Sequence, residues 1–338
     1  MDKKGEQLDI RGNGIIPVIY VPATCLAEAV HKSILACHDE GRRVETPKQK
    51  PGMTLGYDAD MIVRIEIPDS EPKICFPGYY EDERGTIQYI LEVTHGIHNH
   101  WKKNPNDPND TKWGYTYNER FVNQIPFILA RIKKDWDDKK RISGRDYQFV
   151  TWRADEDIIL EQEDPPCLQR GQFRFVQDSR GDIVMGYITD WRSRDLLKAW
   201  NENIVGQIEL MKLFRDKVSN MLGIPIKLGS YIDRSSSLHL YGLYVDRDDL
   251  ENIINNMKRD GWEKRSMSLE DYLGDRTELK RIVAAQTDAT DRGLGTNLNS
   301  SALKDLGYDL ANFPYPTEWD TWPKSWDREA DPALLRRS

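Results

Sequence analysis

The segment from residue 172 to residue 189 places the strongest constraint on the fold. Residues 172–177 read QFRFVQ, where polar and apolar residues largely alternate, residues 183–189 read IVMGYIT, and the five residues between them read DSRGD. Alternation and runs rich in β-branched and aromatic residues predict strands, and a short connection containing Gly and Asp predicts a hairpin. The middle of the chain is therefore expected to form a β-sheet that buries one of its faces.

Further elements are expected on both sides of this hairpin. Apolar residues at helical spacing predict helices over residues 23–38, 87–92, 120–136, 195–222 and 246–258, and alternation predicts strands over 61–67, 147–152, 226–232 and 238–245. This order predicts an α+β fold with one mixed β-sheet and helices packed on one face. We expect residues 1–260 to form one domain and residues 261–338 to form a C-terminal extension packed on it.

The extension contains the segment FPYPTEWDTWPKSWD at residues 313–327. Its three prolines and three tryptophans exclude a regular helix or a central strand. We expect an extended tail that lies across the body of the protein. A lid over a bound ligand is the alternative.

The charge balance limits the classes of partner. The chain has 48 Lys and Arg residues against 56 Asp and Glu residues, and its net charge is -8. A broad nucleic-acid surface needs a cationic face, so no nucleic-acid partner is expected. The chain has no apolar run of the roughly 18 residues that a membrane span requires, and no membrane partner is expected. The first residues include no apolar stretch typical of a signal peptide, so we expect a cytoplasmic location.

Four cysteines occur without the close pairing of a disulfide framework, which leaves room for a free thiol with a chemical role: Cys25, Cys37, Cys75 and Cys167. Cys167 follows two prolines and precedes a predicted strand. Its position alone is compatible with a nucleophile and with a small apolar residue that packs ahead of the strand.

Two other motifs point to a nucleotide-like ligand. Arg192, Ser193 and Asp195 stand where a predicted strand gives way to a helix, and a guanidinium, a hydroxyl and free backbone N–H groups there can bind a phosphate. His239 and Tyr241 are two residues apart on a predicted strand, so their side chains share one face. That face is suited to a sugar.

Together these motifs resemble the thymidylate synthase family. The similarity rests on the following motifs, which occur in the family's order over residues 147–245: WRAD at 152–155, Pro165-Pro166-Cys167 ahead of the strand that starts at Gln172, Arg192-Ser193 with Asp195 and Asn203, and His239 with Tyr241. The chain resembles a diverged branch, because Leu168 and Trp191 stand where the family usually has histidine and glutamine. The resemblance implies a thymidylate-synthase-like homodimer formed through the sheet.

The resemblance also implies a reaction. Cys167 would attack C6 of a pyrimidine nucleoside monophosphate, which makes C5 able to accept a one-carbon unit. The co-substrate would be 5,10-methylenetetrahydrofolate, and no metal is implied. Arg43, Arg192 and Ser193 would bind the phosphate, and Arg145 would be donated across the dimer interface. The second arginine of that pair is replaced by Asp146, which either weakens phosphate binding or transfers the role to Arg141.

The remaining roles follow from the same resemblance. Asn203 would read the pyrimidine edge, because its amide is both donor and acceptor and can pair with N3–H and O4 of uracil. Relatives that act on cytosine nucleotides often carry aspartate at this position, so the resemblance favours uracil. The sugar hydroxyl would be bound by His239 and Tyr241, and the folate by Asp195 and Trp113. Glu92 is the candidate acid–base carboxylate, followed by Glu81 and Glu83. A solvated helix face is the alternative explanation for Glu92.

Three outcomes remain open for this site. Methylation of dUMP to dTMP is the first expectation, and hydroxymethylation of dUMP, dCMP or CMP at C5 is the second. Exclusion of water and retention of the folate would favour methylation. The third is a nucleotide-binding protein without turnover. A metal site at His95, His98 and His100 is a weaker alternative, because no second ligand cluster accompanies these residues.

Overall fold

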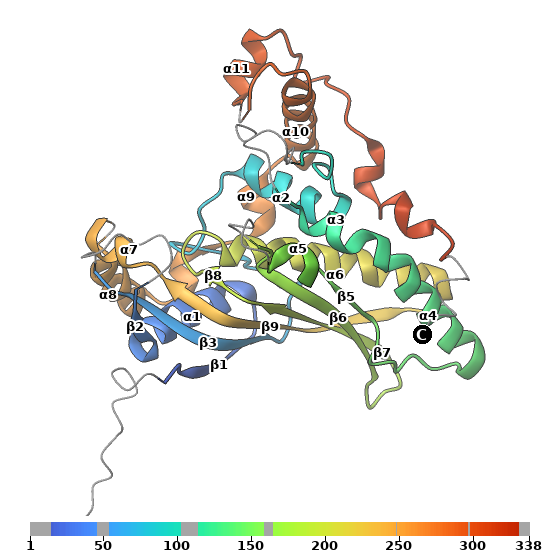
Figure 1. Cartoon of the computed structure of the whole chain (residues 1–338), viewed down its shortest axis with the longest axis horizontal. Coiled ribbons are helices and arrows are strands. Elements are labelled where there is room, and N and C mark those ends of the chain that lie inside the picture. The colour runs from blue at the N-terminus through green and yellow to red at the C-terminus, as the bar shows by residue number, and fades with distance from the viewer. Residues whose placement is uncertain are drawn as a thin grey trace, which may run out of the picture.

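A mixed sheet of eight strands forms the centre of the computed structural model, which describes residues 15–45, 54–102, 114–158, 165–247, 249–296 and 298–330. The main strand order is β1-β3-β9-β7-β6-β5, while β2 pairs with β3 and β8 pairs with β9. The strands are β1 (Val18–Ala23), β2 (Arg42–Val44), β3 (Gly56–Ile65), β5 (Gln148–Val150), β6 (Leu168–Gln177), β7 (Ile183–Trp191), β8 (Arg194–Asp195) and β9 (Ile226–Leu240). Figure 1 shows them as one twisted layer.

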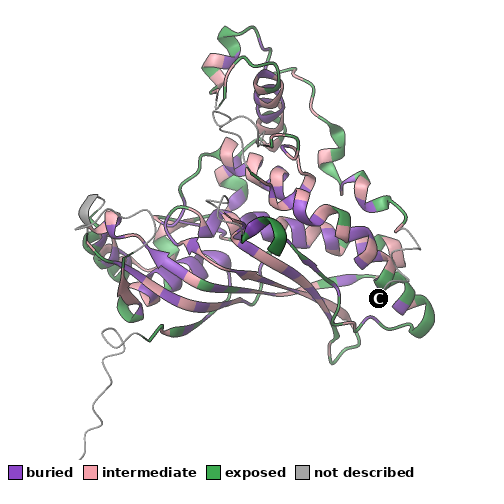
Figure 2. Ribbon diagram, in the orientation of Figure 1, coloured by how far each residue is buried: buried purple, intermediate pink, exposed green. Residues whose placement is uncertain are grey.

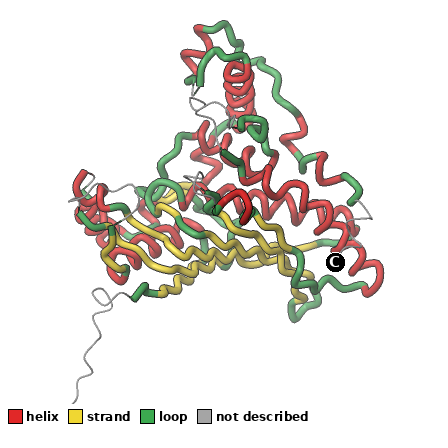
Figure 3. Tube along the Cα trace, in the orientation of Figure 1, coloured by secondary structure: helices red, strands yellow, loops and turns green. Residues whose placement is uncertain are grey.

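Helices pack on one face of this sheet, as Figures 1 and 3 show. The main ones are α1 (Leu26–Glu40), α2 (Glu83–His95), α4 (Ile125–Lys139) and α6 (Trp200–Leu222). Helix α6 contacts β9, and α1 and α2 both contact α6. The strands bury alternate side chains beneath these helices, including Met61, Val63 and Tyr187, and the alternation of buried residues is visible in Figure 2. The predicted α+β class is confirmed.

The predicted hairpin is present and longer than expected. Strands β6 and β7 pair antiparallel over nearly their whole length, with Gln172 opposite Ile188. The turn between them contains Gly181, whose φ of 89° lies in the left-handed region that favours glycine. The side chain of Asp178 accepts from the backbone N–H groups of Arg180 and Asp182, which stabilises the turn.

The prediction of two strands over 226–232 and 238–245 was wrong. The structure has the single strand β9, and residues after it form helix α7 (Gly242–Arg247). The polar run Asp233 to Ser237 suggested a loop, but Asp233 and Ser235 are fully buried within the strand. A buried carboxylate requires partners, and here they come from residues distant in the sequence.

The main partner of Asp233 is Arg194 of β8. The two side chains form a buried ion pair, and the Arg194 guanidinium also donates to Ser235 Oγ at 2.8 Å. Trp200 Nε1 donates to the Asp233 carboxylate at 3.1 Å. The guanidinium carbon of Arg194 lies 4.0 Å from the ring centre of Trp191. This network joins β7, β8, β9 and the start of α6.

Two predicted helices have different boundaries. Helix α6 begins at Trp200 rather than at residue 195, because residues 194–195 pair with β9 as β8. The predicted helix 120–136 is divided into α3 (Tyr117–Phe121), a 3-10 turn (Val122–Gln124) and α4. Pro126 stands at the start of α4, where its missing N–H group costs no helical hydrogen bond.

Residues after 260 contribute to the main core and also form a small second one. Strand β10 (Ser266–Met267) pairs with β4 (Ile74–Cys75), and α9 (Leu269–Leu273) buries Leu269 in the main core. Helices α10 (Arg276–Asp291) and α11 (Ser300–Asp305) project from the body in Figure 1 and pack against each other around their own apolar cluster. The domain boundary near residue 260 stays a prediction.

The Trp- and Pro-rich tail has no α-helix and two 3-10 turns (Thr317–Asp320 and Lys324–Asp327). Trp326 is 2% exposed and packs edge-on against Phe214 of α6. The segment thus lies along the helical layer, as the extended-tail interpretation predicted. Among the described helices, none is long and apolar enough to span a membrane.

We expect Asp233→Ala to lower the free energy of unfolding by about 3–5 kcal/mol, because it leaves the Arg194 charge buried without its main partner. Urea unfolding monitored by circular dichroism measures this. The control is Lys133→Ala, which removes an exposed ion pair with Asp137 and should cost less than about 0.5 kcal/mol. Equal losses in the two variants would contradict the structural role of the buried pair.

Candidate active site

Cys167 is the one cysteine of the four that is not buried, and all four lie in the described part of the chain. It stands immediately before β6, half-buried at the edge of the core. Burial raises the pKa of Cys25, raises that of Cys37 further, and raises that of Cys75 to about 12. The three buried thiols are therefore protonated at neutral pH, and Cys167 is the candidate for a reactive thiol.

Arg192 holds the segment that carries Cys167. Its guanidinium donates to the carbonyl oxygens of Pro165 at 2.6 Å and Pro166 at 3.2 Å, and its backbone N–H donates to the carbonyl of Cys167 at 2.8 Å. Two contacts of the guanidinium and one of the backbone thus place Arg192 beside the cysteine loop. Ser193 follows at the same corner and is half-buried.

Asp195 and His239 are paired neighbours in the sheet, because β8 runs parallel to β9. The Asp195 carboxylate accepts from Tyr244 Oη and from the backbone N–H groups of Leu197 and Lys198. The ring of Tyr241 lies edge-on to that of His239, with centres 4.6 Å apart. The structure therefore brings Asp195, His239 and Tyr241 together.

His239 is 3% exposed, and its Nε2 atom is a buried polar atom without a hydrogen-bond partner among the described residues. Its other ring nitrogen lies 3.2 Å from Ser237 Oγ. Burial lowers the pKa of His239, although the charges of Asp195 and Asp58 oppose this, and the ring is neutral near pH 7. A neutral imidazole with one unpartnered nitrogen can accept from or donate to a ligand hydroxyl.

Asn203 lies on the first turn of α6 and contacts Tyr89 of α2. Its Nδ2 donates to Tyr89 Oη at 2.9 Å. The ring of Tyr117 lies edge-on to that of Trp191, with ring centres 5.6 Å apart. Burial is the main cause that raises the pKa of the Tyr117 phenol, and the charge of a nearby Cys167 thiolate raises it further. Tyr89, which the sequence analysis did not single out, thus lies at this site beside Asn203.

Glu92, the candidate acid–base carboxylate, lies on α2 one turn from Tyr89. Its Oε1 accepts from Gln88 Nε2 at 2.9 Å and lies 2.7 Å from His98 Nδ1. His98 is 1% exposed on its side chain, and its Nε2 lies 3.0 Å from Thr287 Oγ1 of α10. The Glu92 side chain is therefore held by partners and does not simply face solvent. Through His98 and Thr287 its hydrogen-bond network reaches the C-terminal extension.

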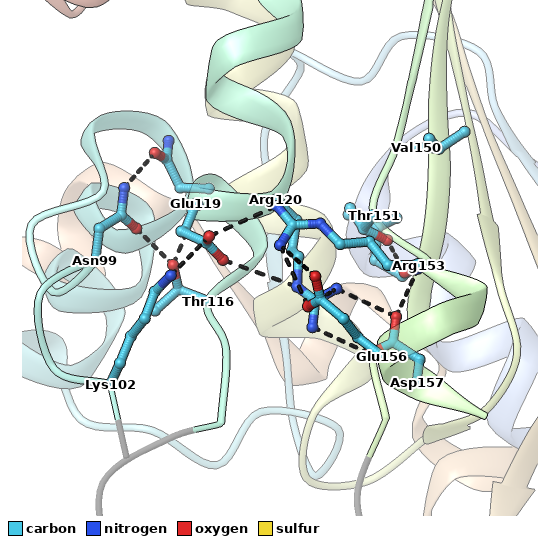
Figure 4. Close-up of polar contacts among 12 residues, drawn as sticks. Asn99, Lys102, Thr116, Glu119, Arg120, Val150, Thr151, Arg153, Glu156 and Asp157 are labelled. Carbon is cyan, nitrogen blue, oxygen red and sulfur yellow. Dashed lines mark hydrogen bonds and ion pairs between the residues drawn. The ribbon is translucent and has the colours of Figure 1, made fainter. Parts of the chain in front are cut away.

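A second polar network supports the chain ahead of Cys167, and Figure 4 shows it between α3 and α5 (Ala154–Asp157). The buried Arg120 contacts Asp157 at 3.0 Å, and Asp157 also accepts from the backbone N–H of Arg153 at 2.6 Å. Thr151 Oγ1 donates to the carbonyl of Leu168, the residue after the cysteine. This network connects the WRAD segment to the start of β6.

Glu202 is a further acidic residue that the sequence analysis missed. Its side chain accepts from the backbone N–H groups of Tyr80 at 2.9 Å and Glu81 at 2.8 Å. Burial raises its pKa to about 7, and the charges of Glu81 and Asp195 act in the same direction. A carboxyl group that titrates near neutral pH beside a candidate site is typical of acid–base function, although buried structural groups can show the same shift.

The remaining predicted binding residues are Arg43, Arg145 and Trp113. The Arg43 guanidinium lies over the Tyr57 ring at 4.3 Å, and Tyr57 is paired with Leu240, the residue between His239 and Tyr241. Arg145 is exposed at the opposite edge of the sheet, just before β5. Trp113 lies outside the described residues.

The other acidic and histidine candidates show separate contacts. Glu83 begins α2, and the Glu81 backbone contacts Glu202. His95 Nε2 lies 2.7 Å from the Thr321 carbonyl, and His100 contacts Asp291. No group of three metal-ligating side chains is found within the described ranges. His95, His98 and His100 each contact a different partner.

Two residues that the sequence analysis did not name had weak signals in the sequence. Tyr89 lies three residues before the candidate Glu92, and Gln207 lies four residues after the candidate Asn203, so each pair shares a helix face. Arg194 gave no signal, since an arginine between Ser193 and Asp195 is most simply read as a solvated side chain. The pairing with Asp233 depends on the sheet register.

No family model matches the chain. A deoxyuridylate hydroxymethyltransferase of Pseudomonas phage M6 is 26% identical over 130 residues, which are 38% of this chain and 33% of the phage protein. The chain thus matches about a third of the length of this curated relative. The solved structure of thermostable thymidylate synthase A from Bacillus subtilis superposes with a TM-score of 0.45 and 16% identity, covering 69% of this chain and 84% of that one.

The match to the phage protein adds to the four ordered motifs around Cys167. Together they support a diverged member of the thymidylate synthase family. The structure brings Cys167 and Arg192 together, and it brings Asp195, His239 and Tyr241 together at the adjacent strand ends.

We expect the stability contributed by Glu202 to depend on pH. Its pKa is about 7 in the folded chain and 4.5 when unperturbed, so its stabilising effect is complete below pH 4.5 and lost as the pH rises to 7. Relative to Glu202→Gln, the wild-type free energy of unfolding should fall by about 3 kcal/mol across this range, at about 1.4 kcal/mol per pKa unit. Urea unfolding at a series of pH values measures this, and parallel pH profiles would contradict it.

Proposed function

We propose that the protein catalyses folate-dependent transfer of a one-carbon unit to C5 of a pyrimidine nucleoside monophosphate, through a covalent bond between Cys167 and C6. The observation that carries this proposal is the contact of Arg192 with the cysteine loop. Its guanidinium binds the two carbonyls ahead of Cys167, at the corner that leads into Asp195 and His239. The thiol of Cys167, the Arg192 cation and the polar residues Asp195 and His239 thus follow one another along β6, β7, β8 and β9.

The proposed roles of Cys167 and Arg192 follow from this arrangement. The Arg192 cation favours the thiolate of Cys167 and can bind a phosphate at the same time. The thiolate electron pair forms the sulfur–C6 bond, and the electrons of the C5–C6 double bond move onto C5 and O4. C5 would bond the one-carbon unit of the folate and lose its proton, and the carbon–nitrogen bond to the folate would then break, so that tetrahydrofolate leaves and an exocyclic methylene group remains at C5. Addition of water, or of a hydride supplied by tetrahydrofolate, to that methylene carbon would be followed by expulsion of the Cys167 thiolate, which restores the C5–C6 double bond.

The polar groups at the strand ends fit the two ligands. The unpartnered Nε2 of His239, with Tyr241 beside it, is suited to the sugar hydroxyl. The Asp195 carboxylate is held by Tyr244 and the backbone, and it is a fixed acceptor for the N–H groups of a pterin ring. The co-substrate 5,10-methylenetetrahydrofolate would supply the one-carbon unit. The role of Trp113 in holding it stays a proposal.

Hydroxymethylation of dUMP is the form of the reaction that the named phage relative favours. In that form, water adds to an exocyclic methylene group at C5, whereas hydride addition would give the methyl group of dTMP. The residues that decide between them are those that exclude water near C5. Leu168, in place of the histidine usual in the family, changes the polarity beside the cysteine.

We expect incubation with dUMP and methylenetetrahydrofolate to convert dUMP to a C5-substituted product. Mass spectrometry of the nucleotide distinguishes a gain of CH2 from a gain of CH2O, and parallel reactions with UMP, dCMP and CMP define the substrate. Cys167→Ser should abolish the product, while Cys37→Ser, at a buried cysteine, should retain it in the folded protein.

A 5-fluorinated dUMP provides the complementary measurement. With the folate present, the intact wild-type chain should gain the mass of both ligands, and Cys167→Ser should not. Nucleotide binding without an adduct or a product would instead favour the non-catalytic alternative.

We also propose that the protein acts as a homodimer formed through the sheet. The sheet face that points away from the helices in Figure 1 presents exposed apolar side chains at Val18, Tyr20, Val150 and Val176. Its centre contains Ile62, Ile188 and Ile232, which the strand register places on the same face. The same register places charged side chains on this face, among them Arg64, Arg170, Asp190 and Arg234, so the face combines apolar and charged groups. A broad face of this composition is suited to pairing with a second copy of itself.

A dimer would allow Arg145 to act in the site of the other subunit. We expect Arg145→Ala and Cys167→Ala to be inactive separately and to recover activity when the two are mixed and allowed to exchange subunits. In such a heterodimer one site has both residues intact. Activity assays of the mixture measure this, and light scattering gives the mass against 39.3 kDa for one chain. A monomer, or no recovery, would contradict the proposal.

A further inference from the structure

We propose that Tyr89 determines the choice of base, because its hydrogen bond fixes the Asn203 side-chain amide in the orientation that matches uracil and opposes cytosine. This inference rests on the proposed function, since it concerns the nucleotide that the same site would bind. It adds a residue on α2 to a recognition step that the motifs assign to Asn203 alone.

The position of Tyr89 is set by its packing. Asn203 Nδ2 donates to Tyr89 Oη at 2.9 Å, and the Tyr89 ring lies against Gly206 one turn further along α6. A Cβ atom at Gly206 would lie 2.7 Å from a ring carbon of Tyr89, so only glycine leaves room for the ring there. The phenol is therefore held against the same helix that carries Asn203.

The charges around Tyr89 favour one orientation of its phenol hydrogen. Burial is the main cause that raises the pKa of Tyr89, and the nearby charge of Glu92 raises it further, so the phenol stays protonated at neutral pH. The charge of Glu92 attracts the phenol hydrogen, whereas the charge of Arg194 favours the oxygen lone pairs. The phenol oxygen accepts from Asn203 Nδ2 through a lone pair, and the charge of Glu92 favours a phenol hydrogen that points away from the amide.

This hydrogen bond determines what Asn203 can offer to a base. With one N–H of Nδ2 bound to Tyr89, the amide retains its second N–H as a donor and Oδ1 as an acceptor. Uracil presents N3–H and O4, which match that pair, whereas cytosine presents an acceptor at N3 and an amino donor at C4. Cytosine would need the amide to rotate by half a turn, which places Oδ1 in front of Tyr89. The Nδ2–Tyr89 bond could then be replaced only if the phenol turned its hydrogen away from the charge of Glu92 to donate to Oδ1.

A neighbouring pair on the same helix provides a matched control. Gln207 lies four residues after Asn203, and its Oε1 accepts from Tyr187 Oη at 2.8 Å. Tyr187→Phe thus removes a phenol hydroxyl bonded to an amide of α6, as Tyr89→Phe does, but it does not alter the Asn203 amide.

The test measures binding of dUMP and dCMP by isothermal titration calorimetry. We expect the wild-type protein to bind dUMP at least about tenfold more tightly than dCMP. In Tyr89→Phe this ratio should fall by about tenfold, the effect of losing one hydrogen bond that holds the amide. Tyr187→Phe should leave the ratio unchanged.

Gly206→Ala is the second variant, because the added methyl group displaces the Tyr89 ring while the hydroxyl is retained. This variant should also lower the preference for dUMP over dCMP. It replaces Tyr89→Phe in the test if circular dichroism shows that Tyr89→Phe does not fold. A wild-type preference for dUMP that both variants retain would overturn the role of Tyr89 and leave the proposed function standing. Wild-type protein that binds neither nucleotide would overturn the proposed function, and the inference with it.

Discussion

The buried ion pair between Arg194 and Asp233 is the interaction on which the rest of the site depends. It holds the corner between β7 and α6 against β9, and the carboxylate is also bound by Trp200. Because β8 is fixed there, Asp195 is placed next to His239 in the sheet. The backbone of Arg192, two residues earlier, then binds the carbonyl of Cys167. A buried charge pair tolerates little displacement, since either charge alone would be strongly destabilising.

The site is built where strand ends meet two helices. Strands β6 to β9 supply Cys167, Arg192, Asp195 and His239, while α6 supplies Asn203 and α2 supplies Tyr89. The C-terminal extension reaches this region through His98. One ring nitrogen of His98 contacts Thr287 of the extension, and the other contacts Glu92. Rigid strands position the groups that would bind the nucleotide, and the helices add the groups that would read its base.

Much of the sheet could be predicted from the sequence, because alternation reports directly on which side chains are buried. The hairpin of β6 and β7 is one example. The continuity of β9 could not be predicted, because its central Asp233 is polar and its burial depends on an arginine 39 residues away. For the same reason, Arg194 was not recognised as a structural residue. The start of α6 was placed too early because Asp195 pairs with a strand instead of beginning the helix.

The order of the motifs determined which residues were candidates, and it singled out Cys167, the one cysteine that the fold leaves partly accessible. The tertiary structure alone decided their neighbours. It paired Asn203 with Tyr89, gave Glu202 a pKa of about 7 and joined Glu92 to His98. Local patterns in a chain specify which face of an element is apolar, but hydrogen bonds and desolvation depend on contacts between segments that only packing brings together.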